Sequence, residues 1–474
     1  MPKPLESKFR DILAKIAILS KITIFARFNT MSTFAGHIKI LVVTLLAAMA
    51  MISCQPDWTN DMELTKGISS GNAGGRTSND ETRKVMLLYS AGFNSLSSYL
   101  KSDIEDLKKG WIPDNRRTED IVLIYSHFTR QGGGYSTQTS PTLIRLYRDK
   151  SSEIISDTLM VYPEGTISAS AEQLNNVLTY VKDNFAARSY GMIFSSHATG
   201  YLPAGYYNKT DGGSSDIGWG PAQRRRGLTV VPYVEPEYDP SLPMVKSIGQ
   251  DLVGNESYEI EITDFAEAIP MYMDYILFDA CLMGGVEVAY ELKDKVGKVG
   301  FSQTEVLAEG YCYETLTSHL LEGWEADPQS VCEDFYNQYA RQSGVYQSAT
   351  ISLIDCSQMD PLTRLCKELF KKYSASINSL NPSKVQRFYR GSKHWFYDLK
   401  SILTNAGINE SELRKLRESL NECVIYKANT PMFMSEFEIN TFSGFSMYLP
   451  SNGSNALDTF YKTLKWNQET GLVN

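Results

Sequence analysis

Residues 275–285 read YILFDACLMGG, and residues 192–200 read MIFSSHATG. Each stretch begins with a run of uncharged, mostly apolar residues and ends in small residues around one reactive side chain, Cys281 or His197. Continuous apolar runs of this length are typical of strands in a parallel sheet that is covered on both faces. Both stretches therefore predict a buried strand that ends at a chemically reactive residue.

Similar apolar runs recur on both sides of these two strands and alternate with helical patterns. This alternation predicts an α/β fold with a mostly parallel central sheet and helices on both faces. Such a sheet carries its chemistry at the carboxyl ends of its strands. The predicted strands are 85–89, 121–125, 192–194, 275–278, 298–301 and 350–354, and the helices between them are 95–107, 171–184 and 285–292.

Two regions depart from this alternation. Residues 201–259 are rich in Gly, Pro, Tyr and Asp and are too long for a simple connection, so they predict an inserted hairpin or a loop. After Cys356 the pattern is mainly helical, over 361–373, 384–389, 397–406 and 411–428, with a strand at 445–450. We therefore expect a helical C-terminal region beside the sheet, and we find no internal repeat.

The two strand ends suggest a nucleophile and its base. A cysteine thiol becomes a good nucleophile beside a base, and histidine is the usual one. A lone cysteine or a lone histidine is more often structural, but His197 and Cys281 follow successive strands in the same way. If those strands are neighbours, the two side chains emerge together. The small residues Ala198, Gly200 and Ala280 would let backbone N–H groups approach a substrate carbonyl and form an oxyanion hole.

These motifs resemble the clostripain-like cysteine peptidases of the caspase-like group. The resemblance rests on S-S-H-A-T-G, F-D-A-C, the opening KVMLLYSAGFNSL at 84–96 and SGFSMYLP at 443–450. It implies a caspase-like three-layer α/β/α sandwich over about residues 84–465. It also implies His197 as general base, Cys281 as nucleophile, and the backbone of Ala198 and Cys281 as the oxyanion hole. Asp279 matches the acid at the floor of the primary specificity pocket, where it would pair with a substrate Arg or Lys.

The sequence departs from the family pattern at several positions. Ala198 stands where the family usually has Gly, and Asn94 stands where many relatives have Asp. A second acid for the specificity pocket could be Glu305, Glu309 or Glu314, and the sequence does not choose among them. Some relatives use calcium, but no ligand cluster can be read here, so we expect no cofactor and no metal.

The leading interpretation is a lipid-anchored cysteine endopeptidase that cleaves after Arg or Lys. One alternative is a non-catalytic surface lipoprotein of the same fold that binds peptides or glycans. Another is a transpeptidase or ligase, because an amine can also resolve an acyl-enzyme. Relatives are made as zymogens and cut themselves between the His and Cys strands. In this chain the matching segment holds Arg224, Arg225 and Arg226, although three arginines could equally be a solvated surface patch.

The N-terminus reads as a targeting signal. Residues 40–52 form an uncharged apolar run that is short for a membrane span but suits a signal sequence. Met51-Ile52-Ser53-Cys54 resembles a lipobox, so we expect lipidation of Cys54. We therefore divide the chain into a signal (1–53, true start Met31), a flexible tether (54–83) and the peptidase body (84–474). Gln55 rather than Asp follows Cys54, which favours the outer over the inner membrane of the cell envelope.

The amino-acid composition limits the classes of binding partner that we expect. The 474 residues carry 46 Lys and Arg against 55 Asp and Glu, a net charge of −9. A phosphate backbone needs a basic face, so nucleic acid is not expected as a partner. The common zinc, phosphate-loop, dinucleotide and serine-hydrolase motifs are absent from the sequence. The expected partners are protein or peptide substrates and, through the lipid, a membrane.

Overall fold

The computed structural model describes residues 83–206, 223–225, 228–232, 241–245, 251–390 and 395–474. The predicted signal, the lipobox and nearly all of the tether lie outside these residues. The described residues belong to one compact unit, and the motifs around His197 and Cys281 lie within it.

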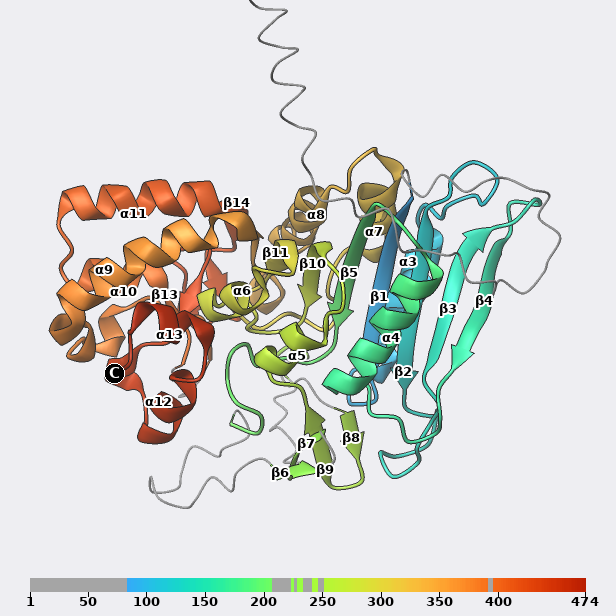
Figure 1. The fold of residues 1–474 in the computed structure, drawn as a ribbon, viewed down its shortest axis with the longest axis horizontal. Helices are drawn as coiled ribbons and strands as arrows, with labels where there is room; N and C mark the ends of the chain where they lie inside the picture. Colours follow the sequence, from blue (N-terminus) through green and yellow to red (C-terminus); the bar gives the residue numbers. More distant parts are fainter. Residues whose placement is uncertain (1–82, 207–222, 226–227, 233–240, 246–250, 391–394) are drawn as a thin grey trace, which may run out of the picture. The chain divides into compact units, whose positions relative to one another are not determined.

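A nine-stranded sheet runs through this unit (Figure 1), with the order β14-β12-β11-β10-β5-β1-β2-β3-β4. Its five central strands, from β11 to β2, are mutually parallel, whereas the two strands at each edge pair antiparallel. The strands are β1 (Lys84–Gly92), β2 (Ile121–Phe128), β3 (Thr142–Arg148), β4 (Ile154–Val161), β5 (Ser189–Ser195), β10 (Met273–Asp279), β11 (Val296–Phe301), β12 (Thr350–Asp355) and β14 (Val424–Asn429).

The parallel centre forms where the sequence has its longest apolar runs. All nine residues of β1 are buried, and the last five residues of both β5 and β10 are buried. Gly191 of β5 lies opposite Tyr275 of β10, where an added Cβ would come within 1.9 Å of the tyrosine ring. A side chain at position 191 would therefore push the two catalytic strands apart.

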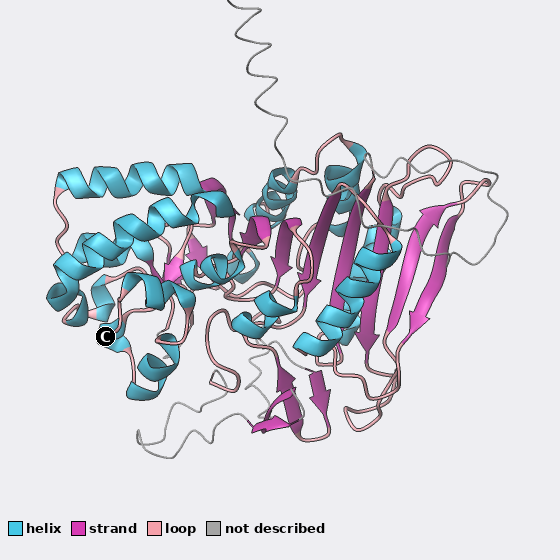
Figure 2. Ribbon diagram, in the orientation of Figure 1, coloured by secondary structure: helices cyan, strands magenta, loops and turns pink. Residues whose placement is uncertain are grey.

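Helices cover both faces of the parallel centre (Figure 2), which gives the predicted three layers. On one side α4 packs against α5 and α5 against α6, and on the other side α3 packs against α7 and α7 against α8. Ser170 caps α4 by accepting a hydrogen bond from the Gln173 amide. The helices are α3 (Ser97–Lys109), α4 (Ala171–Asn184), α5 (Ile262–Ala268), α6 (Val286–Leu292), α7 (Tyr313–Thr317) and α8 (Pro328–Ala340).

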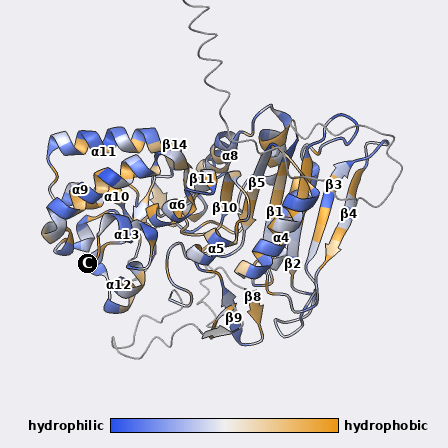
Figure 3. Cartoon of the chain, viewed as in Figure 1, coloured by the Kyte–Doolittle hydropathy of each residue, from blue (hydrophilic) through white to orange (hydrophobic). Residues whose placement is uncertain are grey.

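The C-terminal region is largely helical, as expected. Its helices are α9 (Met359–Asn378), α10 (Leu399–Asn405), α11 (Glu410–Cys423), α12 (Asn455–Tyr461) and α13 (Lys465–Thr470). Two small antiparallel pairs accompany them, β13 (Tyr397–Asp398) with β17 (Ser446–Met447) and β15 (Met432–Phe433) with β16 (Phe437–Glu438). Apolar residues concentrate in the central strands, whereas the exposed α11 is largely hydrophilic (Figure 3).

Two helical predictions in this region are wrong. Residues 384–389 form no α-helix, because only a short 3₁₀ turn, Pro382–Lys384, precedes an irregular segment. The helix predicted over 411–428 ends at Cys423, after which the chain continues as β14. Val424, Ile425 and Tyr426 have high strand propensity, and pairing with β12 decides their conformation.

The predicted insert, 201–259, contains a small separate sheet. Its described strands are β6 (Gln223–Arg225), β7 (Leu228–Pro232), β8 (Asp251–Val253) and β9 (Glu256–Glu259). They are ordered β6-β7-β9-β8, so β6 is an edge strand that pairs only with β7. The sheet lies beyond the carboxyl ends of β5 and β10, on the side of the unit where α5 begins (Figure 1).

Candidate active site

The ends of two adjacent parallel strands create the candidate site. β5 and β10 are neighbours, and Ser195 at the end of β5 lies opposite Asp279 at the end of β10. His197 and Cys281 each follow two residues later, so they leave the same edge of the sheet at equivalent positions. The structure thus brings together the two residues that the sequence singled out.

The Cys281 sulfur is buried against the loop that follows β11. Its Sγ accepts a hydrogen bond from the Val306 amide at 3.0 Å, and the residue has 0% exposure. The same sulfur donates to the Val306 carbonyl at 3.7 Å, so the backbone of one residue meets it on both sides. Leu282, the next residue, has a φ of 61°, which is a strained conformation for a side chain of this kind. Its amide donates to the Thr304 carbonyl at 2.9 Å, which holds the strained turn against the loop that follows β11.

His197 lies on the other strand end with little solvent contact. Its Nε2 is 3.2 Å from the Oγ of Ser95, in the loop between β1 and α3, and the residue is 6% exposed. Three loops, after β1, β5 and β10, therefore meet around the dyad. Sequence reasoning did not identify Ser95, because serine in a loop after a strand carries no distinctive signal.

Tight contact between the His197 and Cys281 loops explains the small residues found there. Gly200 has a φ of 64°, and an added Cβ would come within 2.4 Å of the Leu282 carbonyl oxygen. Ala198, in contrast, is not among the described residues with positive φ. An alanine therefore fits where the family usually has glycine, and it keeps the backbone N–H that the oxyanion hole needs.

Asp279 is buried beneath the dyad at 1% exposure. Its Oδ2 accepts hydrogen bonds from the Tyr313 hydroxyl at 2.6 Å and the Ser195 hydroxyl at 3.0 Å. Burial, and then the charge of Asp279, raise the pKa of Tyr313 and Tyr339 well above the usual value, so both phenols stay neutral donors. The carboxylate thus lies in an aromatic setting, and a substrate cation would have to join or displace the two hydroxyls.

The three alternatives for a second pocket acid differ in their surroundings. Glu305 is 3% exposed and forms a bidentate ion pair with Arg390, at 2.6 Å (Nε–Oε2) and 2.9 Å (Nη2–Oε1). Glu309 and Glu314 are exposed. Because Glu305 immediately precedes Val306, its ion pair helps to fix the loop that contacts the nucleophile.

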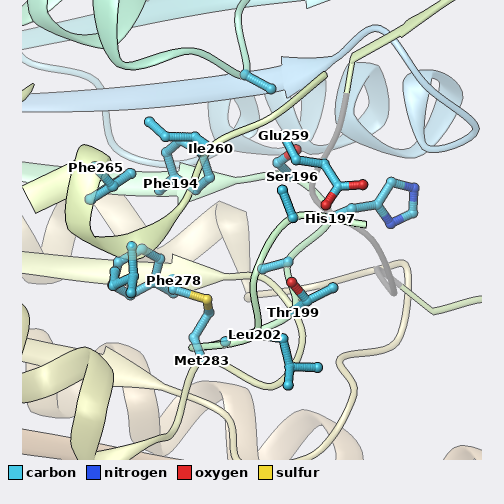
Figure 4. Close-up of a pocket in the computed structure, with 15 residues that line it drawn as sticks. Phe194, Ser196, His197, Thr199, Leu202, Glu259, Ile260, Phe265, Phe278 and Met283 are labelled. Atoms are coloured by element: carbon cyan, nitrogen blue, oxygen red, sulfur yellow. The ribbon is translucent and has the colours of Figure 1, made fainter. Parts of the chain in front are cut away.

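A cavity opens beside His197 (Figure 4), and Asp279 is not among the residues that line it. We call it the His197 pocket, and His197 and Glu259 lie at its polar end. Burial raises the pKa of Glu259 to about 7, against the opposing effect of hydrogen bonds from the Gly205 amide at 2.7 Å and the Ser257 hydroxyl at 3.2 Å. Apolar side chains form the opposite end, namely Phe194, Phe265, Phe278, Ile262 and Met283.

A second histidine, His127, belongs to a separate buried cluster. Its Nδ1 is 2.8 Å from the Ser168 hydroxyl and 3.5 Å from the Asp251 carboxylate. Both partners face the same ring nitrogen, whereas a catalytic triad needs the serine and the acid on opposite nitrogens. Asp251 also accepts hydrogen bonds from the amides of Ser168 and Ala169. Since Asp251 lies in β8, the cluster attaches the insert to the body.

The insert also contacts the loop that carries Val306, whose amide donates a hydrogen bond to the Cys281 sulfur. Val245 forms a β-bridge with Leu307, and the Ala308 amide donates to the Met244 carbonyl at 2.9 Å. Leu307 directly follows Val306, the residue whose amide contacts Cys281. The insert therefore braces the same loop that contacts the buried Cys281 sulfur.

The described part of the chain offers no metal centre, because no three His, Cys, Asp or Glu side chains within it are grouped to hold an ion. All six cysteines in that part are free thiols. No described helix is both long enough and apolar enough to cross a membrane. Of the residues predicted to act, Cys54 and Arg226 lie outside the described ranges, and Arg224 and Arg225 lie in β6.

The chain is similar in sequence and fold to known peptidases. The model of the clostripain family matches residues 88–217 and 236–472. An inactive zymogen C11 protease from Parabacteroides distasonis is 26% identical, with a TM-score of 0.64 over 83% of this chain and 99% of that one. A secreted C11 cysteine protease from Bacteroides thetaiotaomicron is also 26% identical, with a TM-score of 0.64 over 82% and 99%. Comparison with curated proteins gives no match. These similarities confirm the predicted caspase-like α/β fold.

Proposed function

Because the chain belongs to the clostripain family of cysteine peptidases, as its motifs predicted, we propose that it is an endopeptidase that cleaves after Arg or Lys with a Cys281–His197 dyad. The observation that carries this proposal is the pairing of β5 with β10, which gives His197 and Cys281 equivalent positions at one sheet edge. Family membership also favours the enzyme over the non-catalytic alternative.

In the proposed mechanism, the thiolate of Cys281 attacks the carbonyl carbon of the scissile bond. The carbonyl oxygen becomes an oxyanion, which the backbone N–H groups of Ala198 and Cys281 would stabilise. The C–N bond then breaks as His197 gives a proton to the leaving amine. Water, deprotonated by His197, attacks the resulting thioester and releases the acid and the free enzyme.

The proposed preference for Arg or Lys rests on Asp279. A carboxylate two residues before the nucleophile, buried among tyrosines, offers a basic side chain an ion pair in a setting that water screens poorly. Arginine could also stack on the aromatic rings. Glu305 is already paired with Arg390, so we assign the specificity to Asp279 alone.

A panel of fluorogenic peptides that differ only in the residue before the scissile bond tests the function. We expect Arg and Lys substrates to be hydrolysed with kcat/KM at least about 100-fold above Asp and Leu substrates, because only a basic side chain gains an ion pair with the buried Asp279 carboxylate. Equal or preferential cleavage after Asp or Leu would contradict the assignment of the pocket. Adding an amine acceptor and analysing the products separates hydrolysis from transpeptidation.

We further propose that the chain is made as a zymogen. Cys281 has 0% exposure and His197 6%, so a peptide bond cannot reach the sulfur without a rearrangement. The insert braces the loop after Val306 through Met244 and Val245. Cleavage within the insert would release one end of this brace and allow the loop to move.

The segment at Arg224, Arg225 and Arg226 is the proposed self-cleavage site. Arg224 and Arg225 lie in the edge strand β6 of the insert sheet, where Arg225 pairs with Leu228. Edge strands and loop tips are accessible to proteases. We expect purified wild type to contain two associated fragments, the second beginning directly after one of these arginines, as N-terminal sequencing would show.

Two variants control this experiment. Cys281→Ala should remain a single chain, and a triple Arg→Gln variant of the three positions should remain uncut although its dyad is intact. Cleavage of Cys281→Ala at the same bond without added protease, or full activity of an uncut wild type, would refute self-processing at this site.

We also propose that the mature protein is a lipoprotein of the cell envelope, in the outer rather than the inner membrane. The support is the lipobox at residues 51–54 and Gln55 after the cysteine. Mass spectrometry of the membrane fraction should find the mature N-terminus at Cys54 with a diacylglycerol mass on it. In Cys54→Ala the protein should leave the membrane fraction; a mature chain that keeps Met31 would disprove the anchor.

A further inference from the structure

We propose that the His197 pocket binds an apolar side chain of the substrate residue that follows the scissile bond, the P1′ residue. This inference rests on the proposed function, because it uses the positions of the nucleophile and the base. It adds a second specificity determinant, independent of Asp279, on the opposite side of the cleaved bond.

The chemistry of the reaction decides which substrate residue lies beside His197. In acyl transfer the histidine must hand its proton to the leaving nitrogen, within hydrogen-bond reach. That nitrogen belongs to the P1′ residue, so the P1′ side chain starts two bonds from the atom that His197 contacts. A cavity that His197 lines, and that neither Cys281 nor Asp279 lines, therefore lies on the leaving-group side.

The lining of the pocket selects the class of side chain. Figure 4 shows Phe265, Phe278 and Met283 gathered at one end, away from His197 and Glu259. The three apolar side chains are only 3%, 1% and 6% exposed. The empty space within the cavity is about 530 Å³, a value that includes the part open to solvent. A leucine, isoleucine or phenylalanine side chain would lose water on entry and be stabilised.

Glu259 at the polar end argues against a charged P1′ residue. Its carboxyl already accepts hydrogen bonds from the Gly205 amide and the Ser257 hydroxyl. An acidic P1′ side chain would meet this carboxyl and the apolar wall, and a lysine would have to bury its charge next to the phenylalanines. We therefore expect kcat/KM to be highest for peptides with leucine or phenylalanine at P1′, lower for alanine and glycine, and lowest for aspartate.

Internally quenched peptides that share one Arg residue before the scissile bond and vary only P1′ test the proposal. Active wild type should cleave the leucine peptide with kcat/KM about tenfold above the glycine peptide. Ile260 also lines the pocket, and in Ile260→Trp the indole added at the wall should reduce this ratio to about two. Asp183→Trp, which adds the same group on the exposed part of α4, should leave the ratio unchanged.

A second measurement does not depend on the folding of Ile260→Trp. When an Arg ester acylates wild type, an added amino acid amide can attack the thioester: its nitrogen bonds to the acyl carbon, its proton passes to His197, and the thiolate leaves. Leucinamide should compete with water about tenfold better than glycinamide, because it binds the same pocket before it attacks.

The outcomes separate this inference from the function on which it rests. Cleavage after Arg with equal rates for leucine, glycine and aspartate at P1′ would overturn the pocket assignment and leave the function intact. A leucine preference that Ile260→Trp and Asp183→Trp reduce equally would overturn it as well. If the active-site thiol is intact and no peptide in the set is cleaved, the proposed function fails, and the pocket assignment fails with it.

Discussion

Cys281→Ala is expected to lower kcat/KM for Arg substrates by a factor of about 10⁴ or more, and His197→Ala by a similar factor. The two residues act as one unit, because the thiol reacts only as a thiolate and the leaving amine departs only with a proton. The double variant should therefore be no slower than either single variant. Steady-state kinetics on wild type and the three variants, all at the same protein concentration, check this expectation.

Matched controls separate catalysis from folding. Cys312→Ala removes another free thiol, and His319→Ala removes a histidine that is paired with Asp334 at 2.8 Å, away from the strand ends. Both should retain activity within a few-fold. Thermal unfolding of Cys281→Ala should resemble that of wild type, because alanine is similar in size to cysteine and the hydrogen bonds between the sulfur and Val306 involve only the backbone of Val306. Turnover above about 1% of wild type in a folded Cys281→Ala would exclude it as the nucleophile.

Asp279→Asn is expected to reduce kcat/KM for Arg and Lys substrates by roughly 10²–10³, and to leave the rate for a Leu substrate within a few-fold. The amide oxygen of Asn can still accept from Tyr313 and Ser195, so the local structure is preserved while the charge is lost. Rates for the three substrates, measured side by side, give the change in preference directly.

The control for this variant is Asp274→Asn, near the other end of the same strand β10. It removes an equal charge far along the strand from the dyad and should not alter the preference. If Asp279→Asn slows Arg and Leu substrates equally, Asp279 supports the structure of the site and does not select the substrate.

The parts of the fold that follow from apolar runs were predictable from the sequence. β1, β2, β5 and β10 are largely buried strands whose runs of hydrophobic residues stand out in the sequence, and α4 was predicted to its exact bounds. The antiparallel pair β3 and β4 was missed because its strands mix apolar with polar and charged residues. Only two of the seven residues of β3 are buried, and such a strand is defined only by the neighbour it pairs with.

The same contrast holds at the site. His197, Cys281 and Asp279 lie in short motifs beside predicted strands, so the sequence indicated them. Val306, Tyr313 and Glu259 could not be identified, because they reach the site from distant segments with no pattern of their own. Gly200 was noted only as a small residue; its positive φ and its contact with the Leu282 carbonyl follow from how two loops meet in space.

The order of strands in the sheet has a thermodynamic consequence for the cut protein. A break between β5 and β10 divides the sheet into two pieces, since β1 to β5 precede the break and β10 to β14 follow it. The β5–β10 contact, internal in the intact chain, then becomes an interface between two polypeptides. Unfolding of the intact chain is independent of concentration, whereas the cut form dissociates as it unfolds, so its melting temperature rises with protein concentration. At low protein concentration, fragments that separate as the cut form unfolds would not meet again. A mature enzyme that has once unfolded would therefore not regain activity.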